Sequence, residues 1–259
     1  MINVSVNVAI NAAESDAVAT ITLPDCSPLS VHDLDFGLAL RDAVRDAAES
    51  DEIKAIVIRA GGGDFSPEVS TEALAEAAAA RKDKIWSTWH EVYAAPSGLY
   101  QNLCFCKKVV ITAVRGQCSG AGSLLVLCSD LTVATPDATF GSPFSTLPEA
   151  NLVLAALTMR LNRAKSWLFS GNALTAGEAH EAGLINRIVN ADALDAEAQK
   201  MARAVTRMPL DGIAMSKINV ETCLDAQGIG REFDMADFYA VTLQRYWDAV
   251  AAQGQGAGR

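Results

Sequence analysis

The stretch that decides the fold is residues 109–134, VVITAVRGQCSGAGSLLVLCSDLTVA. It begins with an apolar, β-branched run, Val109–Val114, which is typical of a buried strand. A loop with three glycines follows over Gly116–Gly122, then an apolar helix over Ser123–Cys128 and a second strand over Leu131–Ala134. The order strand, helix, strand along the chain predicts that the two strands pair in parallel through a right-handed crossover.

The same alternation of strands and helices extends toward the N-terminus. Residues 4–10 alternate apolar with polar or small side chains as a half-buried strand does, and residues 17–23 alternate again, so together they predict a hairpin. Apolar side chains then recur at helical spacing over residues 36–47. A β-branched strand over Ile53–Arg59 is followed by glycines and by an alanine-rich helix over Thr71–Asp83. The predicted order before the central stretch is therefore ββαβα.

Helices become more frequent toward the C-terminus. One helix is expected over Glu149–Phe169, and the capping-box pattern Thr175-Ala-Gly-Glu178 opens a short one. A last short strand is expected within Leu184–Val189, and the chain beyond it is predicted to be helical. We therefore expect two parts. Residues 1–191 form a strand-bearing core, and residues 192–259 form a helical region that serves as a separate layer or as an assembly surface.

The composition argues against several classes of protein. With 21 Lys and Arg against 31 Asp and Glu, the net charge of −10 argues against a nucleic-acid-binding surface. No apolar run approaches the roughly 20 residues that cross a membrane, so no transmembrane helix is expected. The first ten residues lack a basic segment followed by a continuous apolar stretch, which predicts a cytoplasmic rather than an exported protein.

The cysteine and histidine residues give no metal-binding pattern. The six cysteines form no CxxC pair, and with the three histidines they show no zinc spacing. Cys104 and Cys106 form a CxC that, at strand spacing, would share one face without supplying a second pair of ligands. We therefore expect buried, reduced thiols, no metal and no redox cofactor.

Two glycine-containing loops are candidates for chemistry because each leaves a buried strand and enters a helix. They are Gly61-Gly-Gly-Asp-Phe-Ser66 and Gly116-Gln-Cys-Ser-Gly-Ala-Gly122. Such loops offer unpaired backbone N–H groups to an oxygen anion. Neither loop has the Lys-Ser/Thr of a phosphate loop or the spacing G-x-G-x-x-G, and Ser119 is not framed as G-x-S-x-G. The structural alternative is that the glycines only permit tight turns.

At this point several motifs resemble the crotonase family, the enoyl-CoA hydratase/isomerase superfamily. The resemblance covers about residues 18–189. The matching segments are Val110-Ile-Thr-Ala-Val-Arg-Gly116, Gly120-Ala-Gly122, Cys128-Ser-Asp130, Ala138-Thr-Phe140-Gly-Ser-Pro143, Ile53–Arg59, Asp64-Phe-Ser66, Leu168-Phe-Ser-Gly171 and Ala179–Val189.

The resemblance implies a fold, a ligand and an assembly. The fold is α/β, a crotonase-like spiral of ββα units with a helical C-terminal region that packs subunits into trimers or dimers of trimers. The ligand is an acyl-CoA thioester whose carbonyl oxygen lies in an oxyanion hole, so that coenzyme A arrives as part of the substrate and no further cofactor is needed. Two backbone N–H groups pointed at that oxygen stabilise an enolate, and each accounts for about 10²–10³-fold in rate.

Following the family motif without gaps places the two donors at Val69 and Ala121. In the first loop Glu68 replaces the family's usual glycine and Ser70 its usual aspartate. The residues that the resemblance places around the substrate are Phe65, Ser66, Glu68, Trp86, Trp89, Gly120, Leu124 and Phe144.

The general acid/base pair of the family's hydratases is missing. Those enzymes have one glutamate three residues after the second donor and another after the F-G-x-P stretch, where this chain has Leu124 and Phe144. Neither side chain can move a proton. The resemblance therefore implies an isomerase, a hydrolase, or a hydratase of a cyclic or aromatic acyl-CoA. The alternatives are a non-catalytic acyl-CoA-binding paralogue and an oligomeric assembly protein.

Three ionisable residues are candidates to replace the missing carboxylates. Glu149 lies at the start of a predicted helix, where it would otherwise stabilise the helix N-terminus by its charge. His90 exchanges a proton near neutral pH, although a lone histidine is more often a surface residue. Glu68 ranks last, because a negative charge beside the first donor would oppose an enolate. Trp86 and Trp89 precede His90 in an aromatic segment. The resemblance implies that this segment lines the acyl pocket and suits a flat or bulky acyl group, and the alternative is a packed interface.

Overall fold

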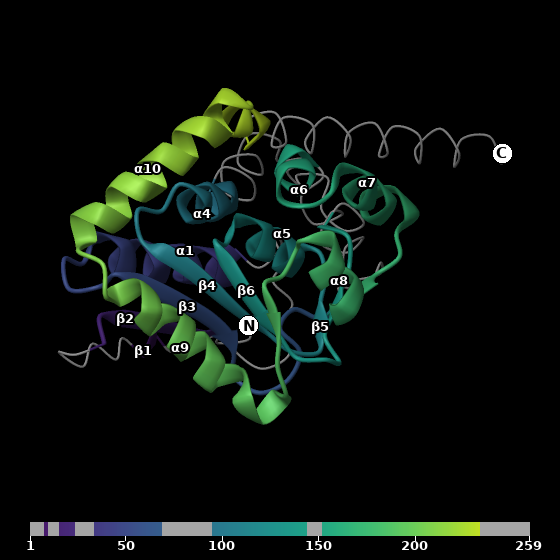
Figure 1. The fold of residues 1–259 in the computed structure, drawn as a ribbon, viewed down its shortest axis with the longest axis horizontal. Helices are drawn as coiled ribbons and strands as arrows, with labels where there is room; N and C mark the ends of the chain where they lie inside the picture. Colours follow the sequence, from purple (N-terminus) through teal and green to yellow (C-terminus); the bar gives the residue numbers. More distant parts are fainter. Residues whose placement is uncertain (1–7, 10–15, 24–33, 69–94, 144–151, 234–259) are drawn as a thin grey trace, which may run out of the picture.

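A computed structural model gives the fold and describes residues 8–9, 16–23, 34–68, 95–143 and 152–233. Among these residues the main sheet has the strand order β1-β2-β3-β4-β6-β9 (Figure 1). β1 pairs antiparallel with β2, and every other neighbouring pair is parallel. The strand bounds are β1 Val8–Ala9, β2 Val18–Leu23, β3 Ala55–Ala60, β4 Val109–Val114, β6 Leu131–Ala134 and β9 Arg187–Ile188.

The central strands are buried on both faces of the sheet. In β3, Ile56 and Ile58 contribute to one apolar cluster, and Ala55 and Val57 to another. Val57 is in register with Ile111 of β4, so the same division continues into the next strand. A parallel sheet needs this double cover, because its crossovers place helices on both faces.

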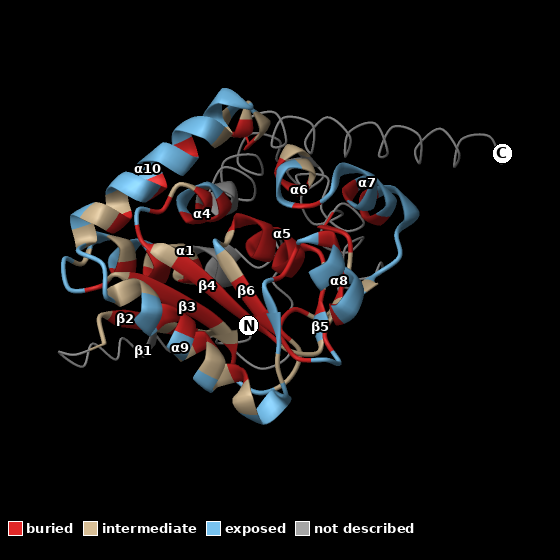
Figure 2. Ribbon diagram, viewed as in Figure 1, coloured by how far each residue is buried: buried red, intermediate tan, exposed pale blue. Residues whose placement is uncertain are grey.

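The helices α1 (Leu34–Glu49), α4 (Ala95–Cys104) and α5 (Ala121–Cys128) cover one face of the sheet. Figure 2 shows that α5 is buried along its whole length, whereas α1 has one exposed side. On α1 the buried residues include Leu40 and Val44, at the helical spacing that the sequence predicts.

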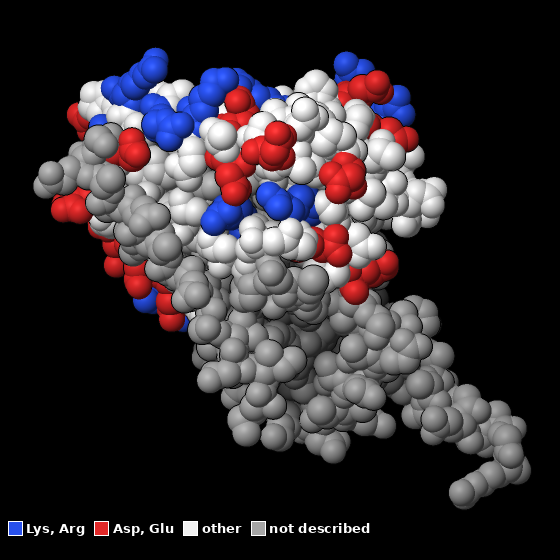
Figure 3. Space-filling model, turned by 90° about the horizontal axis from the view of Figure 1, so that it is seen from below, with Lys and Arg blue, Asp and Glu red and all other residues white. Residues whose placement is uncertain are grey.

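The helix α9 (Leu194–Thr206) covers the opposite face of the sheet (Figure 1). It buries Leu194, Ala198 and Met201 against β3 and β4. Figure 3 shows this side of the molecule from below, with acidic and basic side chains interspersed on it. The helix α9 therefore forms one layer of the core, although it lies beyond residue 191 in the chain. The division of the chain at residue 191 stays a prediction.

A smaller sheet lies beside the main one and carries the second glycine loop. Within the described ranges its order is β5 (Gln117–Cys118), β7 (Thr139–Phe140) and β8 (Leu174–Thr175). The helix α8 (Ala176–Ala182) follows β8 directly. It begins with the predicted capping box, in which Thr175 and Glu178 exchange hydrogen bonds between side chain and backbone.

The single helix predicted over Glu149–Phe169 is wrong in its described part. The structure has two helices there, α6 (Leu152–Thr158) and α7 (Leu161–Ser170). Arg160 separates them because its backbone is extended, with φ −59° and ψ 125°. Its N–H donates to the carbonyl of Ala182 at 3.1 Å. This hydrogen bond occupies a carbonyl at the C-terminal end of α8, so the N–H of Arg160 does not continue the hydrogen bonds of α6.

The helix α10 (Leu210–Ala226) buries two charged side chains on the same side as Ile213 and exposes several apolar ones. The charged residues Lys217 and Glu221 are buried, while Met215 is 58% and Val220 55% exposed. Figure 2 shows α10 as largely exposed along one edge of the molecule. It follows the short 3₁₀ turn Ala191–Ala193 and α9 in the chain.

Two ion pairs hold α10 against the core. Lys217 Nζ lies 2.5 Å from Asp130 Oδ1, and the second oxygen of that carboxylate accepts from the N–H of Val110 at 2.8 Å. Lys107 pairs with Glu221. A buried pair of this kind is costly to break on one side, because an uncompensated charge is left behind.

Most of the other predicted elements agree with the structure. β4 and β6 have the predicted bounds, and α5 begins at Ala121, two residues earlier than predicted. The strand spacing assumed for Cys104 and Cys106 is wrong, because Cys104 ends α4 and the N–H of Cys106 donates to Leu103 in the following turn. The helix predicted over residues 71–83 and most of the first predicted strand lie outside the described residues. Over the described ranges, no helix combines the length and the hydropathy that a membrane crossing requires.

Candidate functional site

The two glycine loops predicted from the sequence lie side by side. Ser66 and Cys118 form a parallel β-bridge. The N–H of Ser66 donates to Gln117 at 2.8 Å, and the N–H of Ser119 donates to Ser66 at 2.9 Å. Asp64 adds a third link, because its Oδ1 accepts from the N–H of Gln117 at 2.8 Å. The first loop is therefore fixed in register with the second as far as Ser66.

The second loop makes a type II′ β-turn over Ser119-Gly-Ala-Gly122. The N–H of Gly122 donates to the carbonyl of Ser119 at 3.0 Å, and Gly120 has φ 54° and ψ −117°. These angles belong to the second residue of a type II′ turn, where a side chain would clash with the backbone and glycine is therefore required. The pattern Gly120-Ala-Gly122 thus has a local structural reason as well as a chemical consequence.

The chemical consequence is that the N–H of Ala121 is left free. Ala121 is the third residue of the turn and the first of α5, so neither the turn nor the helix uses its N–H. This N–H makes no hydrogen bond to any atom in the described part of the chain. The residue itself is only 2% exposed. A donor of this kind is available to an oxygen of a ligand, and it lies at the positive end of the α5 dipole.

Close packing fixes the distance between the two loops. A methyl group added at Gly122 would lie 2.3 Å from Ser66 Cβ and 2.9 Å from its Oγ. Ser66 Oγ also donates to the carbonyl of Ser119 at 3.2 Å. Ser66 is fully buried, so it cannot turn away into solvent. The geometry around Ala121 therefore depends on a residue of the first loop.

The side chains beneath the turn hold no reactive group. Burial raises the pKa of the Cys118 thiol to about 12, although the Ser123 hydroxyl beside it acts in the opposite direction. The thiol is therefore protonated near neutral pH and is a poor nucleophile. Leu124 is buried in α5 as part of the main apolar cluster, and Phe65 is 1% exposed in the same cluster. In the described ranges no group of His, Cys, Asp or Glu side chains is arranged to hold a metal ion.

Of the remaining residues predicted to form the acyl-CoA site, one is exposed and the others lie outside the described ranges. Glu68 is exposed at the end of the described first loop. The others lie outside the described residues, and their assigned roles stay predictions: Val69, Trp86, Trp89, His90, Phe144 and Glu149.

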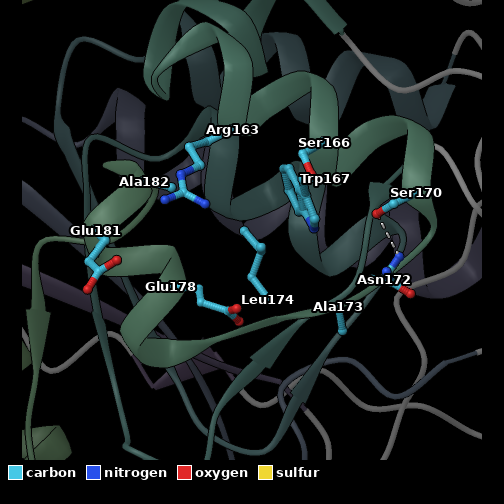
Figure 4. Close-up of a pocket in the computed structure, with 10 residues that line it drawn as sticks. All are labelled: Arg163, Ser166, Trp167, Ser170, Asn172, Ala173, Leu174, Glu178, Glu181 and Ala182. Carbon is cyan, nitrogen blue, oxygen red and sulfur yellow. Dashed lines mark hydrogen bonds between the residues drawn. The ribbon is translucent and has the colours of Figure 1, made fainter.

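The sequence reading missed two features of this half of the molecule. Ser123 was assigned only to an apolar helix, although a serine in such a helix signals a buried hydroxyl that must find an acceptor. The second feature is a surface hollow between α7 and α8, shown in Figure 4, with a volume of about 170 Å³. Its lining includes Arg163, Glu178 and Glu181 around the apolar side chain of Leu174. It shares no residue with the two loops, so it is separate from the candidate site.

Comparison with known proteins identifies the family. The sequence model described as enoyl-CoA hydratase/isomerase matches residues 13–245. The chain belongs to this family. The solved structure of a probable enoyl-CoA hydratase from Mycobacterium smegmatis has a TM-score of 0.72 and 28% identity, covering 93% of this chain and 94% of that one. The predicted family resemblance and the α/β crotonase-like fold class are therefore confirmed.

Two curated proteins that are similar to this chain have names other than enoyl-CoA hydratase. The 1,2-epoxyphenylacetyl-CoA isomerase of Escherichia coli is 35% identical over 124 residues, which are 46% of this chain and 47% of that protein. The (7aS)-7a-methyl-1,5-dioxo-2,3,5,6,7,7a-hexahydro-1H-indene-carboxyl-CoA hydrolase of Mycobacterium tuberculosis is 27% identical over 210 residues, 79% of this chain and 80% of that protein. The relatives thus include an isomerase and a hydrolase.

Proposed function

We propose that this member of the enoyl-CoA hydratase/isomerase family transforms an acyl-CoA whose acyl part contains a ring, by isomerisation, by hydrolysis, or by hydration of a cyclic or aromatic acyl group. The thioester oxygen is bound by the N–H of Ala121 and by that of Val69, which stabilise an enolate. The observation that carries the proposal is the unused N–H of Ala121, held by a type II′ turn that is fixed to the first loop.

The physical argument concerns charge. Removing a proton from the carbon next to the thioester, or adding a nucleophile, places negative charge on the carbonyl oxygen. An N–H that is fixed before the reaction stabilises this charge without reorganising, and one such donor contributes about 10²–10³-fold in rate. The free N–H at the N-terminus of the buried helix α5 fits this role, because the N-terminal end of the helix dipole is positive and also stabilises negative charge on the oxygen.

Ordinary hydration is not proposed, because the acid/base pair is absent. At position 124 the chain has a buried leucine, and at position 144 a phenylalanine. We propose Glu149 and His90 as the groups that move protons instead, on the strength of their positions in the sequence. Trp86 and Trp89 then form part of the wall around the acyl group.

The ring-containing acyl group is supported by the relatives. The printed names of the isomerase and of the hydrolase described above both include a ring in the acyl part. The aromatic segment around Trp89 agrees with such a ligand, because flat side chains stack on flat acyl groups. Coenzyme A then enters as part of the substrate, and we expect no separate cofactor.

The experiment is a turnover assay with a panel of acyl-CoA thioesters. Purified protein is mixed with crotonyl-CoA and with cyclic, phenylacetyl, dienoyl and β-keto acyl-CoAs, and substrate loss is followed by chromatography. Turnover of ring-containing members above crotonyl-CoA is expected. Saturable binding without turnover would instead support a non-catalytic acyl-CoA-binding protein, and no binding of any thioester would refute the proposal.

Variants separate the groups that act. Ala121→Pro removes the donor N–H at the first position of a helix, where proline is tolerated, so we expect a folded protein with at least about 100-fold less turnover. Ala176→Pro is the matched control, because Ala176 is the first residue of α8 and lies outside the two loops. Glu149→Gln and His90→Gln test the proposed acid and base, and full activity in both would show that the proton-moving group lies elsewhere.

We also propose that the apolar side of α10 packs against a second copy of this chain, in a trimer or dimer of trimers. The side chains of Met215 and Val220 would then leave solvent, while Lys217 and Glu221 keep the helix on its own core. Light scattering tests this, since Met215→Glu should lower the mass in solution and Ala196→Glu, at an exposed position of α9, should not. The boundary at residue 191 and a cytoplasmic location stay predictions.

A further inference from the structure

The hydroxyl of Ser123 lies at the base of the type II′ turn and contacts two backbone segments. Its Oγ is 2.8 Å from the carbonyl oxygen of Cys118 and 2.6 Å from that of Gly141. Ser123 is fully buried. A hydroxyl carries one proton, so the two carbonyls share it. The residue therefore connects the segment before the turn, the helix after the turn, and the end of β7.

These contacts act on the peptide that carries the free N–H. The plane of the Gly120–Ala121 peptide is set by ψ of Gly120 and φ of Ala121, and glycine at the first of these positions leaves that plane easy to rotate. The turn's own hydrogen bond, from Gly122 to Ser119, fixes the ends of the turn. The carbonyl oxygen of the central plane accepts from the N–H of Leu124 at 3.1 Å, so the first turn of α5 holds that plane. The direction of the plane therefore follows the start of α5, and the Ser123 hydroxyl connects that part of the helix to the backbone of Cys118 and Gly141.

Other contacts make the role of Ser123 specific. The carbonyl of Cys118 also accepts from the N–H of Gly141 at 2.8 Å, so the bridge between these two strands persists without the hydroxyl. Removing the hydroxyl therefore leaves the small sheet in place and frees mainly the helix side of the turn. The first loop holds the other side, through Ser66 Oγ and the carbonyl of Ser119.

We infer that Ser123 is a positioning residue, whose buried hydroxyl sets the direction in which the Ala121 N–H points at the thioester oxygen. The inference rests on the proposed function. It predicts that loss of the hydroxyl weakens the stabilisation of an enolate oxygen more than it weakens the binding of coenzyme A thioesters in general.

The test compares two thioesters of equal acyl length on three proteins, and Ser123→Cys is added as a fourth. Acetoacetyl-CoA ionises to an enolate, which absorbs in the ultraviolet, whereas butyryl-CoA does not ionise and reports on ordinary binding. The proteins are the parent chain, Ser123→Ala and Ser129→Ala. Ser129 is the matched control, because its hydroxyl also donates to a backbone carbonyl, that of Leu125 at 2.8 Å, but at the far end of the same helix.

The parent chain and Ser129→Ala should bind acetoacetyl-CoA more tightly than butyryl-CoA and increase its enolate absorbance. In Ser123→Ala we expect this preference to fall about tenfold, while the affinity for butyryl-CoA stays unchanged. The fall is smaller than the roughly 10²–10³-fold loss that follows when a whole donor is removed. In turnover, kcat should fall about tenfold while KM stays near the parent value. Ser123→Cys keeps a weak donor of similar shape and should give an intermediate preference.

Each result decides one question. If the parent chain prefers acetoacetyl-CoA and Ser123→Ala keeps that preference, the positioning role is wrong while the proposed function stands. If the parent chain binds neither thioester, the proposed function is refuted and the inference falls with it. Should Ser123→Ala fail to fold, Ser123→Cys decides, and a preference equal to that of the parent chain would overturn the inference.

Discussion

Replacing Gly122 by alanine tests directly how closely the two loops must pack. The added methyl carbon would lie 2.3 Å from Ser66 Cβ, whereas ordinary contacts of this kind begin at 3.4 Å. The loops must therefore separate by about 1 Å, which stretches the hydrogen bond from Ser119 to Ser66 from its present 2.9 Å. Overpacking of this kind costs about 1–3 kcal/mol.

The net loss expected for Gly122→Ala is about 1–2 kcal/mol, because alanine at a helical position returns up to about 1 kcal/mol. Urea unfolding followed by circular dichroism measures it. Gly177→Ala is the matched control, since Gly177 also lies in the first turn of a helix but has no atom within 4 Å of the added methyl group. This control should be about 0.5–1 kcal/mol more stable than the parent chain.

A second substitution identifies the contact responsible. Ser66→Gly removes the carbon atom that the new methyl group would meet, so the double variant should recover at least about 1 kcal/mol relative to the sum of the single changes. Acyl-CoA turnover should fall in Gly122→Ala, because Ala121 moves with the loop. Equal stability of Gly122→Ala and the parent chain, or additive behaviour of the double variant, would refute the argument that these loops are locked together by packing.

Three further predictions concern other parts of the fold. Lys217→Met leaves the Asp130 carboxylate without its ammonium partner and should lower the free energy of unfolding by about 2 kcal/mol or more, whereas Lys200→Met, at an exposed pair, should change it by less than about 0.5 kcal/mol. Both are measured by urea unfolding. The pKa of the Cys118 thiol, raised by burial from 9.0 to about 12, makes stability independent of this thiol below pH 9 and lower between pH 9 and 12, where only the unfolded chain loses the proton. At pH 10 this loss is about 1.4 kcal/mol. Burial also raises the pKa of the Cys104, Cys106 and Cys128 thiols, so both proteins should lose stability between pH 7 and pH 10, and Cys118→Ala should lose less than the parent chain by about this amount. Thr175→Ala removes one half of the capping box and should cost about 1 kcal/mol; no shift in the urea midpoint would contradict this.

The strands were the most predictable part of the molecule. Val109–Val114 is β-branched except at Ala113 and apolar except at Thr112, which is typical of a strand buried on both faces, and β4 has those bounds. The start of α5 was less predictable, because Gly122 looks like a loop residue although the first turn of a helix tolerates glycine. The sequence identified the free N–H at Ala121 only through the family motif. The turn type that frees it depends on the backbone angles of Gly120, and the sequence does not reveal those angles.

The buried charges on α10 were not predicted, and the reason is physical. Lys217 and Glu221 are residues that normally lie on the surface, and their partners are distant in sequence, 87 residues away for Asp130 and 114 for Lys107. Nothing local in the helix indicates that its charged side faces inward. A helical pattern shows which residues share a side, but the identity of the side that faces the core depends on contacts across the whole chain.

The unused amide of Ala121 belongs to the main chain, and this has a consequence for how such a protein changes over generations. Any amino acid except proline leaves an amide hydrogen in place, so mutations nearby can exchange the groups that move protons without erasing the charge-stabilising element. On the proposed function, a chain with Leu124 and Phe144 in place of the family's usual carboxylates keeps a scaffold on which a different reaction can be selected, one side chain at a time.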